Sequence, residues 1–190
     1  MDSLNNSIVL MGCKHCGKTT HGKALASELG VNFFDTDQVM EEMLGKPVRE
    51  FYKEKGVSAF MEAEEAACDK IIEENKDKKI VIATGGGICD NAPAITKLRV
   101  FQKFVFLKLS IEYTVARVSS GIKMLNPGQF QNAPAYILAE NPKSMSQVNE
   151  ILVRKYTERF AQYQAIADII IDIKNTTIEE NFKIIKEALL

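Results

Sequence analysis

One segment carries more structural information than any other: Gly12-Cys13-Lys14-His15-Cys16-Gly17-Lys18-Thr19-Thr20, with the spacing G-x-x-x-x-G-K-T of a phosphate-binding loop. It follows a short apolar run at residues 7–11 and leads into a helical pattern at 18–29 that ends before Gly30. A strand, a glycine loop and a helix in this order are the context that the motif requires. The alternative is a glycine-rich turn before an ordinary helix.

The chemistry of this loop follows from its residue types. Glycines let the chain curl so that backbone N–H groups point inward at phosphate oxygens, and the new helix adds its unpaired N–H groups. Lys18 is placed to reach the β- and γ-phosphates of a nucleotide, and the Thr19 hydroxyl is placed to bind Mg²⁺.

The rest of the chain alternates between short apolar runs and helical patterns. We expect strands at residues 7–11, 31–34, 79–83, 104–109 and 168–173, and helices at 18–29, 37–44, 47–54, 57–75, 90–98, 111–119, 147–165 and 177–189. This alternation predicts an α/β fold with a five-stranded parallel sheet between helices on both faces. The nearly continuous apolar runs at 103–109 and 169–173 are typical of strands buried on both faces.

Residues 119–147 depart from this alternation, because they are rich in Gly, Pro, Asn, Gln and Ser. We expect a long loop or lid there, inserted in a single domain that spans residues 1–190.

Composition narrows the class of protein. The net charge is −1, from 24 basic and 25 acidic residues, so no broad basic surface for nucleic acid is expected. The apolar runs are shorter than a membrane helix, and residues 1–6 lack the pattern of a signal peptide. We therefore expect a cytoplasmic monomer with neither membrane nor nucleic-acid partners.

Cys13 and Cys16 form a C-x-x-C pair inside the loop, with His15 between them. A redox or zinc role is one interpretation. The interpretation that we favour is a reactive thiolate, with a pKa lowered by Lys18 and the helix N-terminus, whose alkylation would block nucleotide binding.

Two further segments follow predicted strands. Asp35 and Asp37 follow the second strand, where both carboxylates can face a cleft; alternatively, Thr36 or Asp37 caps the next helix. Gly85-Gly86-Gly87 follows the third strand, where the main chain can approach a ligand closely; alternatively, it is a flexible turn.

Taken in order, G-x-x-x-x-G-K-T-T, D-x-D and G-G-G resemble the shikimate kinase family. The resemblance extends through most of the chain, to Glu41 with Gly45, Phe60 with Glu64, the strand at 104–109, and Arg159 with Tyr163.

The resemblance implies an ATP-dependent small-molecule kinase with ATP and Mg²⁺ as cofactors, and it implies roles by position. Lys18 and the loop would bind the ATP phosphates, with Arg117 near the nucleotide and Thr19 and Asp35 around Mg²⁺. Asp37 would accept hydrogen bonds from acceptor hydroxyls and serve as the catalytic base. Acceptor contacts would also come from Gly85, Gly86, Gly87, the residue at position 61, and Arg159, which would pair with a carboxylate.

The acceptor side departs from the family pattern. Met61 stands where the pattern has an arginine that would bind the acceptor carboxylate. Glu64 consequently lacks its usual partner; it is either a buried carboxylate paired with Arg49, Lys53 or the substrate, or an exposed edge residue.

The lid departs as well, because no arginine occupies its expected motif. Lys123 is the nearest cation in spacing, and the alternatives for it are a charge on the transferred phosphate, hence a catalytic role, or a solvated lysine. The nearest segment with a proline is 133–136, whose Tyr136 we expect to be a packing residue, like Tyr113.

Three functions remain open. The first is phosphoryl transfer from ATP to shikimate. The second is the same chemistry on another polyol or hydroxy acid, which Met61 favours. The third is a nucleotide-binding protein with little catalysis, which the missing lid arginine favours.

Overall fold

The computed structural model describes residues 6–190. Residues 1–5 lie outside the described part of the chain. They include most of the segment for which no signal-peptide pattern is expected. None of the helices in residues 6–190 is both long enough and apolar enough to cross a membrane.

The centre of the fold is a five-stranded sheet in the order β2-β3-β1-β4-β7, and every neighbouring pair is parallel. The strands are β1 (Ile8–Met11), β2 (Asn32–Asp35), β3 (Ile80–Ala83), β4 (Lys103–Leu109) and β7 (Ile169–Ile173). The predicted sheet is therefore confirmed. Because all strands run the same way, the segments that follow their carboxyl ends meet at one edge of the sheet.

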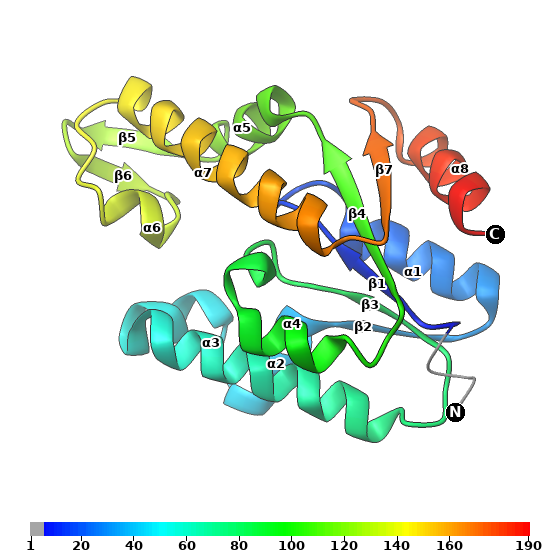
Figure 1. Ribbon diagram of the computed structural model, residues 1–190. Coiled ribbons are helices and arrows are strands. Elements are labelled where there is room, and N and C mark those ends of the chain that lie inside the picture. The colour runs from blue at the N-terminus through cyan, green and yellow to red at the C-terminus, as the bar shows by residue number, and fades with distance from the viewer. Residues whose placement is uncertain (1–5) are drawn as a thin grey trace.

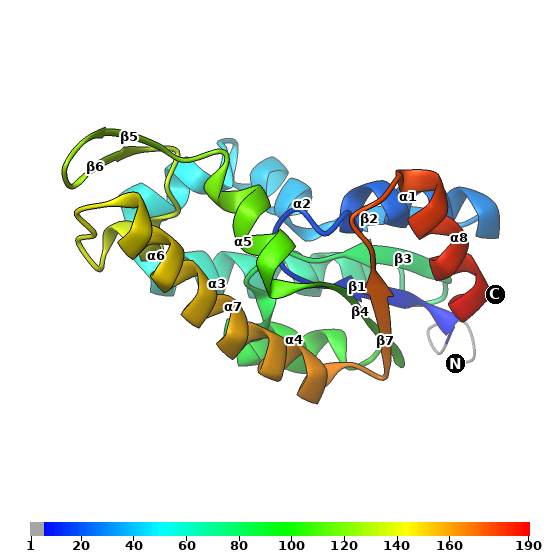
Figure 2. The ribbon, with the colours of Figure 1, turned by 90° about the horizontal axis from the view of Figure 1, so that it is seen from above.

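Helices cover both faces of the sheet (Figures 1 and 2). Side chains of α1 (Lys18–Leu29) and α8 (Ile178–Leu189) form one apolar cluster with Leu10 and Leu107. Those of α2 (Thr36–Leu44), α3 (Val48–Glu74), α4 (Ala92–Leu98), α5 (Ile111–Ser119) and α7 (Met145–Ile166) form the other, around Val9 and Phe106. A short 3₁₀ turn, η2 (Ile88–Asp90), precedes α4.

The two helices expected at 47–54 and 57–75 lie end to end in α3 and are broken at Gly56. Gly56 has φ 81° and ψ −173°, a conformation that only glycine adopts readily.

The expected burial holds for β4 and is wrong for β7. β4 lies inside the sheet and is buried along most of its length, whereas β7 is an edge strand, with Ile170 42% exposed. Ile171 and Ile173 pack toward α8, so one side of the strand meets the core. An apolar run indicates that a strand can be buried on two faces, but the position of the strand in the sheet decides how much of its surface is buried.

Residues 119–147 are more ordered than the expected long loop. They form the antiparallel hairpin β5 (Lys123–Asn126) and β6 (Gln129–Gln131), followed by the short helix α6 (Ala135–Leu138). Pro127 and Gly128, the latter at φ 81°, make the turn of this hairpin. The glycine and proline that are typical of a loop are here the turn residues of a hairpin.

Gly22 of α1 provides a test of the packing between α1 and the sheet. A Cβ on Gly22 would lie 2.5 Å from Cε2 of Phe33 and 3.2 Å from Cδ1 of Leu10. We expect Gly22→Ala to lower the free energy of unfolding by about 1–3 kcal/mol through overpacking, although alanine favours helix formation. Gly121→Ala is the matched control, because its nearest neighbour would be 3.6 Å away. Urea melts of both variants measure the difference, and equal stability of the two would contradict this packing.

Candidate active site

The phosphate-binding loop connects β1 to α1 in the predicted strand–loop–helix order. Gly12 and Gly17 have φ values of 147° and 91°, which disfavour any other residue. A Cβ on Gly12 would also lie 2.7 Å from the Leu107 carbonyl oxygen of β4. The loop is thus held against the neighbouring strand, and it is not an ordinary flexible turn.

Lys18 lies folded over this loop. Its side chain is buried, and its Nζ donates to the carbonyl oxygens of Gly12 at 2.8 Å and Cys13 at 3.1 Å. These carbonyls keep the ammonium at the loop, the place from which it can bind a phosphate held by the loop N–H groups.

Thr19 and Asp35, the expected Mg²⁺ ligands, are in direct contact. The Thr19 hydroxyl donates to Oδ2 of Asp35 at 2.7 Å, and Oδ1 of Asp35 accepts from the Asp37 N–H at 3.1 Å. Asp35 therefore caps α2, and the idea that Thr36 or Asp37 provides the cap is wrong. Thr36 instead accepts a hydrogen bond from the Gly85 N–H at 2.9 Å. Among residues 6–190, no cluster of three or more His, Cys, Asp or Glu side chains suited to a metal occurs.

Two carboxylates converge on Gly85. A Cβ at this residue would lie 2.8 Å from Oδ1 of Asp37 and 2.9 Å from Oε1 of Glu64. Glycine is required here because a side chain would collide with both carboxylates. Burial, followed by the charge of Asp35, raises the pKa of Asp37.

Glu64 is 2% exposed, so its interpretation as an edge residue is wrong. Its partner is neither Arg49 nor Lys53 but Asn91, whose Nδ2 donates to Oε2 of Glu64 at 2.9 Å and to the Met61 carbonyl oxygen at 2.9 Å. Burial raises the pKa of Glu64 to about 7. Asn91, shortly before Pro93, is a recognisable helix-capping residue in the sequence. Nothing in the sequence, however, indicates that its side-chain amide reaches across to α3.

Arg159 of α7 reaches the segment after β3. Its Nε and one terminal nitrogen donate to Oδ2 of Asp90, at 3.1 and 2.8 Å, and the other donates to the Gly86 carbonyl oxygen at 3.3 Å. The guanidinium carbon also lies 5.1 Å from the centroid of the Tyr136 ring. Tyr136 is thus more than a packing residue: it joins α6 to the cation expected to bind the acceptor. Asp90 is a site residue that the sequence reasoning missed.

Arg117 lies beside the phosphate-binding loop, as the resemblance implies. It donates to the His15 carbonyl oxygen at 2.8 Å and to Oδ1 of Asn175, after β7, at 3.0 Å.

The interpretation of Cys13 and Cys16 as reactive thiolates is wrong. The two residues are 1% and 2% exposed, and all four cysteines of the chain are free thiols. Burial, reinforced by the neighbouring Cys16, raises the pKa of the Cys13 thiol far above its usual value. The Cys13 side chain packs into the apolar cluster around Val9 and Phe106, and the Cys16 side chain packs into the cluster with Leu10 and Leu107.

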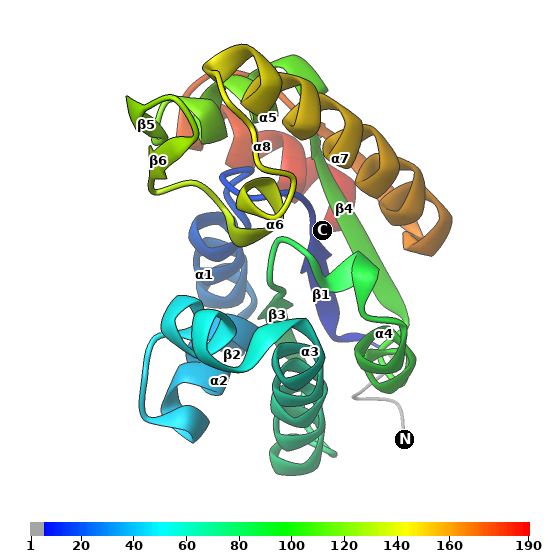
Figure 3. The ribbon, with the colours of Figure 1, turned by 90° about the vertical axis from the view of Figure 1, so that its left-hand side faces the viewer.

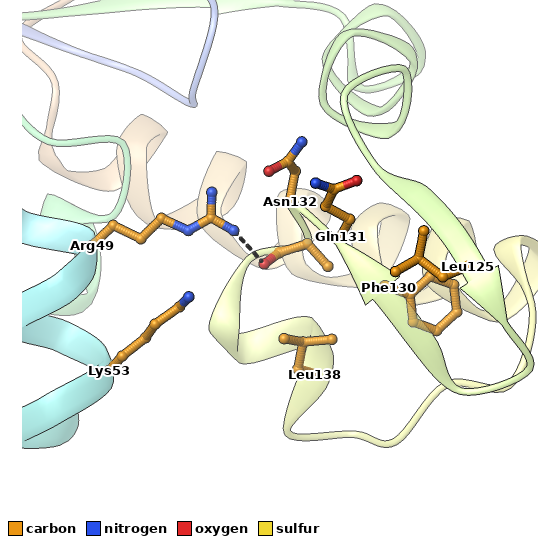
Figure 4. A pocket seen from close by; sticks show the side chains of 8 residues that line it. Arg49, Lys53, Leu125, Phe130, Gln131, Asn132 and Leu138 are labelled. Atoms are coloured by element: carbon orange, nitrogen blue, oxygen red, sulfur yellow. Dashed lines mark hydrogen bonds between the residues drawn. The ribbon is translucent and has the colours of Figure 1, made fainter.

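Lys123 is exposed on β5, in the hairpin, and the structure records no hydrogen bond or ion pair between it and the loop residues among those described. Next to this hairpin lies a hollow of about 550 Å³, between the first turns of α3 and the lid. Figure 4 shows Arg49 and Lys53 of α3 reaching into it, with Arg49 donating to the Ala133 carbonyl oxygen at 3.4 Å. Its other lining residues are Leu125, Phe130, Gln131, Asn132 and Leu138. Asp37, Glu64 and Gly85 are not among the residues that line this hollow.

Glu64 makes the stability of the protein depend on pH. Its pKa rises from 4.5 in the unfolded chain to about 7 in the fold, so the fold favours the protonated acid. Stability is then full below about 4.5 and is lost as the pH rises through about 7, by on the order of 3 kcal/mol. We expect Glu64→Gln to remove this loss, so that its stability relative to the parent rises between pH 5 and 8. Urea melts across that range, without ligands, measure it, and a constant difference would contradict the raised pKa.

Comparisons with known proteins extend the resemblance. The sequence model of the family described as shikimate kinase matches residues 14–190. The chain is 34% identical over 183 residues to shikimate kinase of Moorella thermoacetica, covering 96% of this chain and 94% of the relative. It is 33% identical over 174 residues to that of Caldanaerobacter subterraneus subsp. tengcongensis, covering 92% and 90%.

A solved structure shows the same fold. Shikimate kinase from Acinetobacter baumannii in complex with shikimate superimposes with a TM-score of 0.75 at 24% identity, covering 96% of this chain and 91% of that one. The phosphate-binding loop, the D-x-D segment and the three glycines lie at one sheet edge, as the resemblance implies. Together with the family model and the two relatives, they show that the protein belongs to the shikimate kinase family.

Proposed function

We propose that this protein transfers the γ-phosphoryl group of ATP to a hydroxyl of shikimate, giving shikimate 3-phosphate and ADP. One observation carries the proposal: Lys18, Thr19 and Asp35 stand next to Asp37 and Gly85 at a single sheet edge, so phosphate-binding and hydroxyl-binding groups adjoin. Phosphoryl transfer depends on such positioning and on neutralising charge.

On the nucleotide side, the loop N–H groups and Lys18 would hold the phosphates, and Arg117 would stand beside them. The Thr19 hydroxyl and an Asp35 oxygen, 2.7 Å apart, would hold Mg²⁺, whose preferred ligands are oxygens. When bound, the ion neutralises charge on the β- and γ-phosphates. The hydrogen bond between the Thr19 hydroxyl and Asp35 keeps these two oxygens side by side.

On the acceptor side, Asp37 would accept the proton of the attacking hydroxyl. Its raised pKa makes it a stronger base than an exposed aspartate. The backbone of Gly85, Gly86 and Gly87 would line the acceptor, and Arg159 would bind its carboxylate with a planar, bidentate group. Arg159 is held for this by Asp90 and the Gly86 carbonyl.

A second acceptor class is favoured by one observation at position 61. Met61 is half-buried and offers no side-chain donor, so Arg159 is the only arginine of the described residues that contacts the three-glycine segment. A site with a single arginine suits a polyol, or a hydroxy acid whose anionic group needs only one arginine partner.

The proposal also covers the state of the protein. We infer a single domain over residues 1–190 that acts as a monomer in the cytoplasm, without nucleic-acid or membrane partners. The near-neutral charge and the four free thiols support this inference, since reducing compartments keep thiols unpaired.

ADP release in a coupled assay tests the function. With Mg-ATP, we expect turnover that depends on shikimate and exceeds the rate without an acceptor. Quinate and other polyols or hydroxy acids serve as competing acceptors. Turnover on one of these but not on shikimate would favour the second class, and binding of ATP without turnover on any would favour a non-catalytic protein.

Arg159→Ala tests the acceptor clamp. Because its guanidinium lies against Gly86 rather than against the loop, we expect the KM for shikimate to rise by about 10-fold or more, from the loss of a charged hydrogen bond, with little change in the KM for ATP. Arg154→Ala is the matched control on the same helix, where Arg154 is exposed and paired with Glu140. Equal effects on both KM values would place Arg159 outside the acceptor site.

A further inference from the structure

The transferred phosphoryl group must pass between two sets of residues at the sheet edge. On one side is the phosphate-binding loop with Lys18, and on the other are Asp37 and Gly85. In such a reaction the charge of the group in transit is spread over its oxygens, and a cation placed against them stabilises the transition state. The structure therefore raises the question of which cation stands between the two sides.

Most of the cations near this edge are already committed. Arg159 is paired with Asp90 and Gly86, and Arg117 with His15 and Asn175. Lys18 donates to two loop carbonyls. Lys123 lies out on the hairpin, and Arg49 donates to Ala133 at the hollow beside the hairpin.

Lys14 remains. It is the second variable residue of the loop, and its side chain is exposed. Among residues 6–190, no hydrogen bond or ion pair from its Nζ is recorded. Its charge is thus uncompensated and free to meet an anion.

The position of Lys14 is set by a tight backbone contact with the acceptor segment. A Cβ on Gly86 would lie 3.0 Å from the Lys14 backbone N and 3.3 Å from its Cα. The loop and the three-glycine segment touch at this pair of residues. Lys14 is therefore a loop residue at the boundary with the acceptor site.

The neighbouring loop residue His15 is affected by the charge of Lys14. Burial lowers the pKa of His15, and the charges of Lys14, Lys18 and Arg117 lower it further. A positive charge at Lys14 therefore acts on the phosphate-binding loop.

We propose that the Lys14 ammonium is a further catalytic group, which contacts the phosphoryl group in transit between ATP and the acceptor. The inference rests on the proposed kinase function. In the step, the acceptor oxygen forms a bond to the γ-phosphorus, the bond from that phosphorus to the bridging oxygen of ADP breaks, and the hydroxyl proton moves to Asp37. Lys14 takes no part in the proton transfer and supplies only charge.

The role fits a lysine in an exposed loop position. A flexible ammonium without a partner at rest can turn onto oxygens whose position changes during the reaction, whereas a fixed guanidinium suits a static carboxylate. The contact also explains how the chain can catalyse transfer with no arginine in the lid at residues 119–147.

The test compares four lysine variants in steady-state kinetics on the acceptor that the parent enzyme turns over. For Lys14→Met we expect kcat to fall by about 100-fold, as for loss of one transition-state donor, with each KM changed by less than about 3-fold. Lys14→Arg, which keeps the charge, should recover at least 10-fold of that loss. Lys183→Met removes an exposed lysine of α8 and should match the parent.

Lys123→Met tests whether Lys123, rather than Lys14, is the cation that contacts the phosphoryl group. For every variant, the dissociation constant of Mg-ATP and the thermal melting temperature are also measured. A fall in kcat for Lys14→Met with unchanged nucleotide affinity and melting supports the proposal. A normal kcat for Lys14→Met, a loss that appears only as a higher KM, or a loss that appears with Lys123→Met instead would overturn it. A parent enzyme that turns over no acceptor would contradict the proposed function itself, a result distinct from any of these.

Discussion

The last bonds between β1 and β3 hold the site together. The Leu10 carbonyl oxygen of β1 accepts hydrogen bonds from both the backbone N–H of Thr84, at 3.1 Å, and its hydroxyl, at 3.3 Å. Leu10 lies two residues before the phosphate-binding loop, and Thr84 comes directly before the three glycines. This single acceptor therefore ties the nucleotide side to the acceptor side, and further along the two segments Lys14 and Gly86 lie against each other.

The acceptor side shows how the fold tolerates buried carboxylates. Asp37 and Glu64 face each other across Gly85, and burial penalises the charged form of each. A hydrogen bond from Asn91, rather than from an arginine, satisfies Oε2 of Glu64. Burial raises the pKa of Glu64 to about 7, and the hydrogen bond from Asn91 opposes that rise. With Met61 in place of the family arginine, the hydrogen-bond partner of Glu64 is the uncharged amide of Asn91. Arg159 is the arginine that donates to the three-glycine segment.

In the lid, the local sequence does not predict the structure. Pro127 and Gly128 are typical of a loop, yet they form the turn of a hairpin whose strands are short and mostly exposed. Without a strong apolar alternation, nothing local distinguishes such strands from coil. The sequence likewise predicts only a packing role for Tyr136, because nothing in it indicates that α6 brings this ring to Arg159, 23 positions away.

Local features of the sequence were sufficient for the phosphate-binding loop, the order of strands and helices, the glycine at the end of α1 and the parallel sheet. Each depends on neighbouring residues: glycine for positive φ, apolar periodicity for burial, and alternation for crossovers between parallel strands. The tertiary structure alone decided that β7 lies at the sheet edge, that Cys13 and Cys16 face the core, and that Asn91 serves Glu64. The physical reason is that exposure, thiol pKa and the partner of a buried carboxylate depend on groups brought together across tens of residues, which only the packed fold specifies.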